Sequence, residues 1–403
     1  MSSMVKIRGR IVTADRIIED GVIVAEDGVI TGVIDASGPK SAREEEALRS
    51  TPSQGTTILP GLVDVHCHGG GGASFPNAGT REEAMTAVLE HRRHGTTSLV
   101  ASLVTASRDV LRERSALLAE LADEGELAGI HFEGPFISFE RCGAQDPAYI
   151  IDPDPEFTRE LLGICRGHAL TMTLAPEKQG AYGPGSVAEA LVEGGALPSW
   201  GHTDSGSLHA REALEYSREV LDRTKGRRSA NATITHLFNG MRPLHHRDTG
   251  PIAEFLSDAT RGGTIAEMIC DGVHLDPSLV RDVVEILGRD ACVLVTDAME
   301  AAGMPDGEYV LGSQKVSVED GRALISGQGT LAGGTAHLLD CVRTAVGAGI
   351  GLVNAVYMSS VQGARILGRA DIGCIEAGRR ADLLEVDEGL RPIRVYKDGA
   401  LIR

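Results

Sequence analysis

The hydrophobic pattern has the same character at both ends of the chain. Between residues 4 and 35, short apolar stretches alternate with turns, and "GVIVAEDGVITGVID" places Asp27-Gly28 between two of them. An Asp-Gly pair flanked by alternating apolar residues is typical of a β-hairpin. Residues 381–403 repeat this pattern around Asp398-Gly399. Because neither end is long enough to form a stable sheet alone, we expect the two ends to form one small β domain.

The segment between the ends alternates short apolar runs with helical patterns. A helix is expected from Thr80 to His94, because Thr80 and Glu83 match a capping box and Gly95 is a helix terminator. Another is expected over 277–287, with Asp276 as its N-cap. Eight apolar runs predict strands: "ILPGLVDV", "TTSLVASL", "LAGIHFEG", "LTMTLAPE", "LPSWGHT", "ATITHLFN", "TIAEMICDG" and "CVLVTDA".

Eight strands alternating with helices predict an α/β protein built on a (β/α)8 TIM-type barrel. We expect the barrel over residues 58–360, with a small β-sandwich domain made from residues 1–57 and 361–403. The polar stretch "SGPKSAREEEALRSTPSQG" predicts a loop, and "VSVEDGRALI" predicts a hairpin inserted after the eighth strand.

Composition narrows the class of protein. The 403 residues are 42% hydrophobic and carry a formal net charge of −18, which argues against nucleic acid or an anionic membrane as the main partner. No apolar stretch approaches the length of a membrane span, and the N-terminus lacks the apolar core of a signal peptide. The seven scattered cysteines are expected to be reduced thiols in a cytoplasmic protein.

Ionisable residues follow nearly every predicted strand. In a (β/α)8 barrel the catalytic groups project from the carboxyl ends of the strands, and ionisable groups are costly to bury unless they are paired or bind a metal. Packing alone does not explain the number of ionisable residues at these strand ends. These residues are Asp64, His66, His68, His131, Glu133, Glu177, His202, His236, Asp271, His274 and Asp297.

The first strand ends in His66-Cys67-His68. Side chains alternate along a strand, so both imidazoles lie on one face and can reach one cation, whereas Cys67 faces the other way. Taken alone, the pair is weak evidence for a metal, and two surface histidines in a turn are the more common interpretation. Its combination with other strand-end histidines and carboxylates predicts a metal site instead, with a ligand set typical of Zn²⁺ or a similar divalent ion. The supporting residues are Glu133, His202, His236 and Asp297.

Asp297 follows the buried run "CVLVT" and is the candidate general base. An aspartate beside a metal-activated water can take the proton and later donate it. The alternative is a structural aspartate that caps the next loop.

Three loops carry weaker signals. "THLFNGMRPLHHRDTG" offers backbone N–H groups near Asn239 and Gly240 and an arginine, which would suit a phosphate, although a solvated basic loop is the simpler interpretation. "GTLAGG" is glycine-rich but lacks the residues of a P-loop. "EGPFISFERCGAQDP" predicts a long mobile loop over the barrel mouth, in which Cys142 is either a reactive or a plain exposed thiol.

The motifs together resemble the N-acetylglucosamine-6-phosphate deacetylases of the amidohydrolase superfamily. "LPGLVDVHCHG", "HFEGPF", "TLAPE", "GHT", "THLFNGM", "DGVHL", "VTDAM" and "GTLAGG" occur in the family's order and cover essentially the whole chain. "HFEGPF" with "THLFNGM" is far more specific than the His-x-His pair.

The resemblance implies a role for each candidate residue. Asp297 and His274 are catalytic, as general base and acid and as the hydrogen-bond partner of the acetyl group. Glu133, His202 and His236 bind the principal metal, and His66 and His68 offer a second position that Glu133 bridges. Arg247 is implied to reach the neighbouring active site in a homodimer. The implied substrate contacts are Ala144, Gln145, Asn239, Gly240, Arg247, Asp271, His274, Leu331, Ala332 and Gly333.

Two positions depart from the family pattern. Many relatives have histidine where this chain has Gln145, so one sugar contact is expected to differ. Gly240 stands where alanine is usual, which is a small change if only the backbone N–H is used.

The reaction that the resemblance implies is metal-dependent hydrolysis of N-acetyl-D-glucosamine 6-phosphate to D-glucosamine 6-phosphate and acetate, in amino-sugar catabolism and recycling. Zn²⁺ is the expected ion, with Fe²⁺, Mn²⁺ or Co²⁺ as alternatives and one or two ions per subunit. A deacetylase of the galactosamine epimer would share every motif. A cyclic-amide hydrolase would use a bridging carbamylated lysine, for which Lys178 is the candidate, and a deaminase is also open. A non-catalytic barrel is the distant alternative. Such proteins typically lose metal ligands, whereas every expected ligand is present in this chain.

Overall fold

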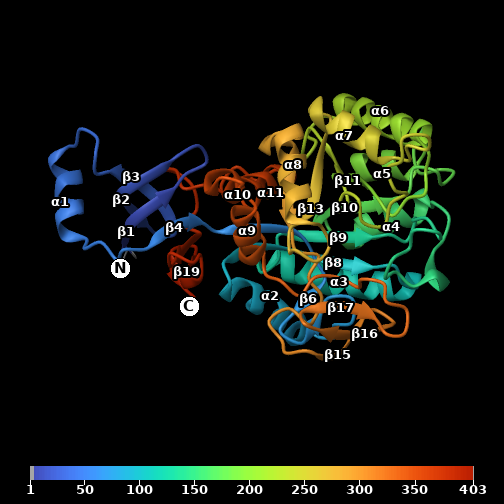
Figure 1. The fold of residues 1–403 in the computed structure, drawn as a ribbon, viewed down its shortest axis with the longest axis horizontal. Coiled ribbons are helices and arrows are strands. Elements are labelled where there is room, and N and C mark those ends of the chain that lie inside the picture. Colours follow the sequence, from blue (N-terminus) through green and yellow to red (C-terminus); the bar gives the residue numbers. More distant parts are fainter. Residues whose placement is uncertain (1–3, 403) are drawn as a thin grey trace.

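The computed structural model describes residues 4–402 and contains a barrel with a smaller sheet at its side (Figure 1). Eight parallel strands form the barrel sheet in the order β14-β13-β12-β11-β10-β9-β8-β5. All eight predicted strands are present, and the predicted fold class is confirmed. Their bounds are β5 Leu62–Cys67, β8 Thr96–Val104, β9 Gly129–Glu133, β10 Ala169–Leu174, β11 Leu197–Trp200, β12 Ala232–Ile234, β13 Thr264–Ile269 and β14 Cys292–Val295.

The barrel closes where its first and last strands meet. Cys67 and Ala298 form a parallel bridge, and Asp297 donates its backbone N–H to the carbonyl of His66 at 2.9 Å. Buried Asp64 strengthens this seam by accepting a 2.6 Å hydrogen bond from the Thr296 hydroxyl. The seam therefore holds His66 and Asp297 next to each other.

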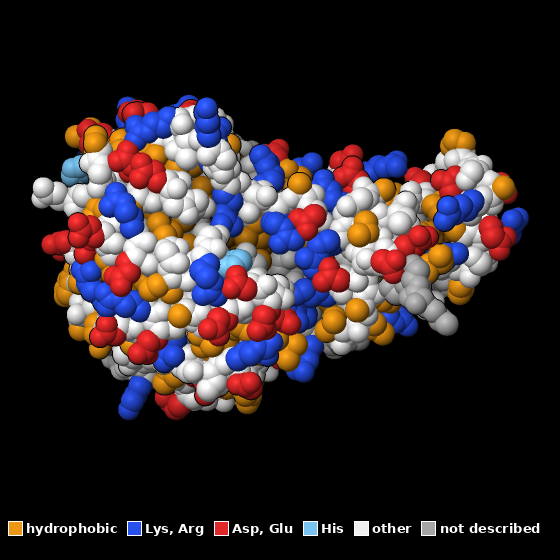
Figure 2. Space-filling view, turned by 180° about the vertical axis from the view of Figure 1, so that it is seen from behind, with side chains coloured by type: hydrophobic (Ala, Val, Ile, Leu, Met, Phe, Trp, Pro, Cys, Tyr) orange, Lys and Arg blue, Asp and Glu red, His pale blue; other side chains and the backbone are white. Residues whose placement is uncertain are grey.

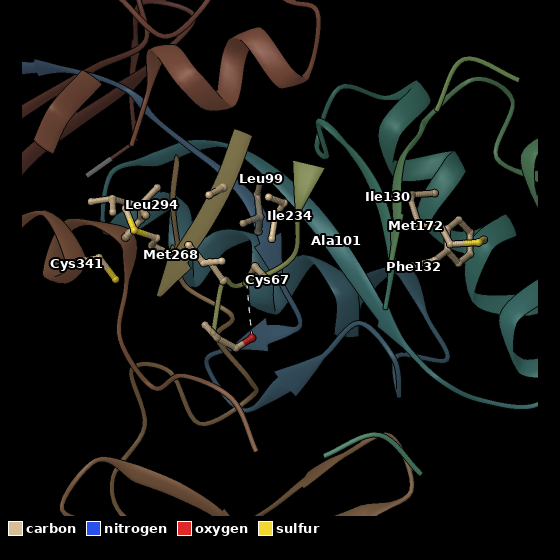
Figure 3. Packing of buried hydrophobic residues seen from close by; sticks show 14 of the residues in the cluster. Cys67, Leu99, Ala101, Ile130, Phe132, Met172, Ile234, Met268, Leu294 and Cys341 are labelled. Carbon is tan, nitrogen blue, oxygen red and sulfur yellow. Dashed lines mark hydrogen bonds between the residues drawn. The ribbon is translucent and has the colours of Figure 1, made fainter. Parts of the chain in front are cut away.

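Helices cover the outside of the barrel. Apolar residues of the strands pack against them, and Figure 3 labels ten members of this core, among them Phe132 of β9 and Cys341 of a covering helix. The helices are α2 Arg81–Arg93, α3 Arg108–Asp123, α4 Pro155–Ile164, α5 Val187–Glu193, α6 Ser207–Arg223, α7 Ile252–Thr260, α8 Pro277–Leu287, α9 Leu338–Gly347, α10 Leu352–Met358 and α11 Val361–Ile366, with short 3-10 turns η1 Pro147–Tyr149 and η2 Arg289–Ala291.

Polar side chains connect neighbouring strands within the barrel. His131 hydrogen-bonds through its two ring nitrogens to Ser102 and Thr173, each at 2.9 Å. Thr173 continues the chain to Thr235, which also contacts Ser199. All five side chains are buried, so these mutual hydrogen bonds offset the cost of removing them from water. Both ring nitrogens of His131 are thus occupied by hydrogen bonds to Ser102 and Thr173, which gives this strand-end histidine a structural role.

The small domain is one seven-stranded sheet made from both ends of the chain. Its order is β20-β19-β18-β4-β1-β2-β3, so strands from the end of the sequence pair with strands from its beginning. Both predicted hairpins are present, and Asp27 and Gly28 adopt φ of 49° and 81° as a tight turn requires. The strands are β1 Met4–Val12, β2 Ile17–Glu26, β3 Val29–Asp35, β4 Thr57–Pro60, β18 Leu383–Val386, β19 Pro392–Lys397 and β20 Ala400–Leu401.

Two details differ from the expectation. The run "ILPGLVDV" is not one strand, because Gly61 separates β4 in the small sheet from β5 in the barrel. A Cβ at Gly61 would lie 2.2 Å from the Thr97 hydroxyl, so the crossing needs glycine. The predicted loop before β4 contains helix α1, Ala42–Ser50, which begins with a capping box of Ser41 and Glu44. The loop prediction was wrong because that stretch has few apolar residues, while its cap signal was present.

The inserted hairpin after the eighth strand is confirmed. It belongs to a three-stranded sheet of β15 Gly307–Leu311, β16 Gln314–Glu319 and β17 Arg322–Ile325. A two-stranded pair, β6 Gly69–Gly70 with β7 Ala73–Ser74, follows the His-x-His segment. No helix within 4–402 is long and apolar enough to span a membrane.

Lysine, arginine, aspartate and glutamate side chains are interspersed over the face in Figure 2, without one large area of a single charge. The seven cysteines, all within the described part of the chain, are free thiols.

The α2 cap offers a direct test of local stability. Thr80 accepts from the Glu83 backbone N–H, and the Glu83 carboxylate accepts from the Thr80 N–H, as predicted. We expect Thr80→Ala to lower the free energy of unfolding by about 1 kcal/mol, because one N–H of the first turn loses its partner. Urea unfolding measures this, with Thr86→Ala within the same helix as control. Equal midpoints for Thr80→Ala and wild type would contradict the assigned cap.

Candidate active site

The candidate metal ligands lie at the carboxyl ends of four barrel strands. His66 lies on β5 with His68 directly after it, and Glu133 is the last residue of β9. His202 and His236 each follow the end of a strand by two residues, after β11 and β12. All five side chains are buried. The parallel strands bring to one edge residues that are far apart in the sequence.

Glu133 and two histidines form the first group. Glu133 Oε1 lies 2.8 Å from His202 Nε2 and 2.9 Å from His236 Nε2. The two Nε2 atoms are 3.1 Å apart. One carboxylate oxygen and two imidazole nitrogens therefore converge on a single point.

The second group shares Glu133 with the first. Glu133 Oε2 lies 3.0 Å from His68 Nε2, and the Nε2 atoms of His66 and His68 are 3.2 Å apart. Asp297 Oδ1 lies 3.3 Å from His66 Nε2 and 3.2 Å from His68 Nε2. The two oxygens of Glu133 thus face different histidine groups, which is the geometry of a bridging carboxylate.

The donor set fits a divalent cation. His202 Nδ1 lies 2.7 Å from the carbonyl of Arg141, and His68 Nδ1 lies 3.2 Å from the carbonyl of Ser102. A carbonyl only accepts, so each ring carries a proton on Nδ1, and in the neutral ring Nε2 is left with the lone pair that a cation would take. Two such neutral rings with Nε2 atoms about 3.1 Å apart would repel each other unless a cation lay between them. Such outer partners are typical of histidines that bind metals.

Backbone conformation is unusual at three of these positions. His202, His236 and Asp297 have φ of 47°, 27° and 49°, in the left-handed region that residues other than glycine rarely adopt. Strained residues of this kind cluster at functional sites, where the surrounding structure holds them in place. Sequence reasoning identified the side chains but had no signal for this conformation.

Charge within the site keeps the carboxylates ionised. Burial alone would raise the pKa of Asp297, but the positive charge of His66 and the hydrogen bond with His68 lower it to about 2. Burial likewise opposes ionisation of Glu133, yet hydrogen bonds with His202, His236 and His68 bring its pKa well below the usual range. A bound cation would act in the same direction on both groups.

The ligand groups open into a cavity of about 430 Å³. Its walls contain most of the residues that the sequence analysis singled out. Those lining it are His68, Glu133, Ala144, Gln145, His202, His236, Asn239, Gly240, His274, Asp297, Leu331, Ala332 and Gly333. Gly240 has no room for a larger residue, because a Cβ there would lie 2.8 Å from His202 Nδ1.

Asp271 lies behind His274 and does not line the cavity. Its carboxylate accepts from the backbone N–H groups of Val273 and His274 and lies 2.7 Å from His274 Nδ1. Burial alone would lower the pKa of His274, but the hydrogen bond to Asp271 raises it. The shift favours the protonated ring, in which Nε2–H is the donor that remains for the cavity because Nδ1 already bonds Asp271.

Gln145 and Arg247 lie differently from the other expected substrate contacts. The Gln145 side chain donates to Glu133 Oε2 at 2.6 Å and accepts from the Thr105 N–H at 2.7 Å. It holds the shared carboxylate as well as facing the cavity. Arg247 is exposed and does not line the cavity of its own chain.

Sequence reasoning missed two charged residues of this region. Glu267 lies within β13 with its carboxylate 3.0 Å from His66 Nδ1, and it also accepts from the His236 N–H. A single acid inside the buried run "TIAEMI" was the available signal. Arg322, from the inserted hairpin, lines the cavity, and its position in an exposed hairpin gave no indication of that.

We expect Glu267→Gln to weaken metal binding by about 10- to 100-fold, because the carboxylate orients His66 and raises its basicity. Competition with a chromogenic chelator measures the affinity. Glu285→Gln, which removes an exposed carboxylate from helix α8, is the control. Equal metal affinity in the Glu267→Gln protein and wild type would mean that the negative charge of this carboxylate does not contribute to metal binding.

Lys178 does not take part in the site. Its Nζ lies 3.7 Å from the carboxylate of exposed Asp152, and it does not line the cavity. The bridging position of the carbamylated lysine is already taken by Glu133. This arrangement does not support a cyclic-amide hydrolase of that type.

A separate group of Glu90, His94 and His337 also lies close together. The two imidazole rings stack with centroids 3.6 Å apart and planes 18° from parallel. A ring nitrogen binds a metal in the plane of its ring, and the planes of stacked rings do not meet at a shared ion. These contacts favour a polar link between α2 and α9 over a metal site.

Comparison with known proteins assigns the class. Residues 57–402 match the Amidohydrolase family. The chain is 33% identical to the N-acetylglucosamine-6-phosphate deacetylase of Lysinibacillus sphaericus over 86% of each chain. It is 29% identical to the N-acetylgalactosamine-6-phosphate deacetylase of Shewanella sp. (strain ANA-3), over 98% of this chain and 94% of that one. A Mycobacterium smegmatis N-acetyl-D-glucosamine-6-phosphate deacetylase variant, solved in complex with N-acetyl-D-glucosamine-6-phosphate, superposes with a TM-score of 0.88 at 34% identity over 99% of both chains.

The fold and the histidine–carboxylate site are thus those of an amidohydrolase. Within that class, the chain belongs to the N-acetylglucosamine-6-phosphate deacetylase family.

Proposed function

We propose that the protein hydrolyses the acetamide bond of N-acetyl-D-glucosamine 6-phosphate to give D-glucosamine 6-phosphate and acetate, a step of amino-sugar catabolism. The observation that carries this proposal is Glu133 shared between two histidine groups at the floor of one cavity, with Asp297 beside them. The membership of the chain in the deacetylase family supplies the substrate class.

Glu133, His202 and His236 are the proposed ligands of the principal cation, with His66 and His68 offering a second position. Imidazole nitrogen and carboxylate oxygen suit Zn²⁺, although Fe²⁺, Mn²⁺ and Co²⁺ accept the same donors. When bound, such an ion supplies Lewis acidity and brings the pKa of a coordinated water to about 7.

Asp297 and His274 have distinct roles in the proposed reaction. Asp297 is ionised, so it accepts a proton from the attacking water and later gives that proton to the amine nitrogen as the C–N bond breaks. His274 donates from Nε2 to the acetyl carbonyl oxygen, on which negative charge develops. Asp271 is the positioning residue that fixes the orientation of the His274 ring.

The phosphate is proposed to bind at Asn239 and Gly240, with Arg247 reaching in from the neighbouring subunit of a homodimer. Gly240 supplies the backbone N–H there, because the Asn239 N–H already donates to the carbonyl of His236 at 2.9 Å. The exposure of Arg247, outside the cavity of its own chain, supports a role toward another subunit. Ala144, Leu331, Ala332 and Gly333 line the cavity and are the proposed sugar-binding walls. We expect the enzyme in the cytoplasm, where its free thiols stay reduced.

We expect Arg247→Gln to raise KM for the phosphorylated sugar by about tenfold or more, because a charge-assisted hydrogen bond is lost. The unphosphorylated sugar should be turned over as before. His246→Gln is the neighbouring control. Arg322→Gln tests the other arginine near the site. If only this variant loses its preference for the phosphorylated sugar, Arg322 of the chain's own hairpin binds the phosphate instead of Arg247.

The function itself is tested by acetate release from N-acetylglucosamine 6-phosphate, from the unphosphorylated sugar and from the galactosamine epimer, each with and without a chelator. Chelator-sensitive turnover of the glucosamine phosphate in preference to the others supports the proposal. Preference for the galactosamine phosphate would favour the second candidate, the activity named for the Shewanella relative. Absence of turnover with metal bound would refute both.

A further inference from the structure

A second cavity, of about 220 Å³, has no part in the proposed reaction. Its walls come from the end of strand β8, from Tyr149, and from the hairpin turn at Gly312 and Ser313. Helix α3 closes another side with residues spaced three and four apart, which lie on one face of a helix. Those residues are Ser107, Val110, Leu111 and Arg114.

Arg114 is the single charged residue among those that line this cavity. Its Nε is buried and no described residue accepts a hydrogen bond from it, and its guanidinium makes no ion pair within residues 4–402. A buried donor left without an acceptor costs free energy, although the side chain as a whole is only half-buried. Arg114 therefore has donors available for an anion in the cavity.

A neighbouring acid does not fill this role. Glu83 and Arg114 both lie close to Gly79, so Glu83 is the acid to consider as a partner of Arg114. The Glu83 carboxylate instead accepts from the N–H groups of Gly79 at 2.6 Å and Thr80 at 3.1 Å. That carboxylate is committed to the cap of helix α2. Arg114 therefore has no carboxylate partner within residues 4–402, in a chain whose net charge is −18.

The rest of the lining includes both apolar and polar residues. Leu103, Val104 and Leu111 provide apolar surface, and Tyr149 provides a hydroxyl. The Asn77 amide is already hydrogen-bonded to the backbone of Gly312. An apolar cavity of about 150 Å³ is large enough for benzene, so 220 Å³ has room for a ring with a carboxylate. We propose that this cavity binds a small carboxylate with an apolar body, through an ion pair with Arg114.

The site lies next to the active site without overlapping it. Thr105 lines this second cavity, and its N–H donates to Gln145, which contacts Glu133. Gly312 lines it as well, directly after Leu311 of the active-site cavity. The binding site proposed here does not depend on the reaction catalysed next to it.

The test is a calorimetric titration of the metal-loaded protein with benzoate, and with benzamide as a neutral probe of the same shape. We expect saturable benzoate binding, with benzamide at least about tenfold weaker because it lacks the charge. Arg114→Gln should weaken benzoate by a similar factor. Arg112→Gln, on the same helix but paired with Glu160, should bind as wild type does.

Val110→Phe provides a second variant, because it fills the cavity without touching the charge. We expect it to abolish benzoate binding while circular dichroism shows an unchanged fold. No saturable binding to wild type, or equal binding by the Arg114→Gln protein, would overturn the proposal. Benzoate binding that survives Arg114→Gln and is lost in His202→Asn would place the probe on the catalytic ions and overturn it too.

Discussion

Replacement of Asp297 by asparagine is expected to lower kcat by about 10²- to 10⁴-fold while leaving the metal content of the protein unchanged. Asparagine has the same size and hydrogen-bonds to the same neighbours, but it does not accept and return a proton. It also tolerates the left-handed conformation that Asp297 adopts, so the backbone is expected to stay in place. A larger drop with loss of metal would indicate that Asp297 is a ligand first.

The measurement is acetate release at saturating substrate together with elemental analysis of the same preparation. Asp276→Asn, at the N-cap of helix α8, is the matched control because asparagine caps a helix equally well. A metal-loaded Asp297→Asn protein with full turnover would remove this residue from the mechanism.

Replacement of His202 by asparagine is expected to lower kcat/KM by about 10³-fold or more. The lost ion contributes several kcal/mol of charge stabilisation, and each 1.4 kcal/mol is worth a factor of ten. His202 and His236 share one oxygen of Glu133, so losing either leaves the principal group with two donors.

His68→Asn is the informative partner variant. It removes a donor from the second group and leaves Glu133, His202 and His236 intact, so we expect the loss of at most one ion and a much smaller fall in kcat/KM. Elemental analysis of both variants beside wild type decides between one and two ions per subunit. Equal losses in the two variants would show that the groups work only as a pair.

The barrel was predictable because its strands are short, apolar and regularly spaced. The strand-end residues were predictable once the strands were located, because parallel strands bring their carboxyl ends to one edge. Helix α1 was missed because its residues are mostly charged and offer no apolar stripe, although Ser41 and Glu44 carry a capping signal.

The interactions between site residues were harder to predict. Nothing in the sequence indicates that Gln145 binds Glu133, because the two side chains meet only when the loop after β9 folds back to the strand end. Glu267 was passed over because it interrupts an apolar strand by a single residue. The proposed partner of Arg247 lies on another chain, which neither the sequence nor a single subunit displays.

The sheet made from both chain ends has a consequence for synthesis. Thr56 donates a hydrogen bond to Glu385, which is 329 residues further along, and strand β18 covers the edge of β4 beside it. At about 5 to 20 residues per second, a ribosome needs roughly 20 to 60 seconds to deliver that partner. All eight barrel strands are made in that interval, while the edge of β4 stays open. We therefore expect nascent chains to depend on chaperones during this interval, and pulse proteolysis of ribosome-bound chains would detect the unpaired strand.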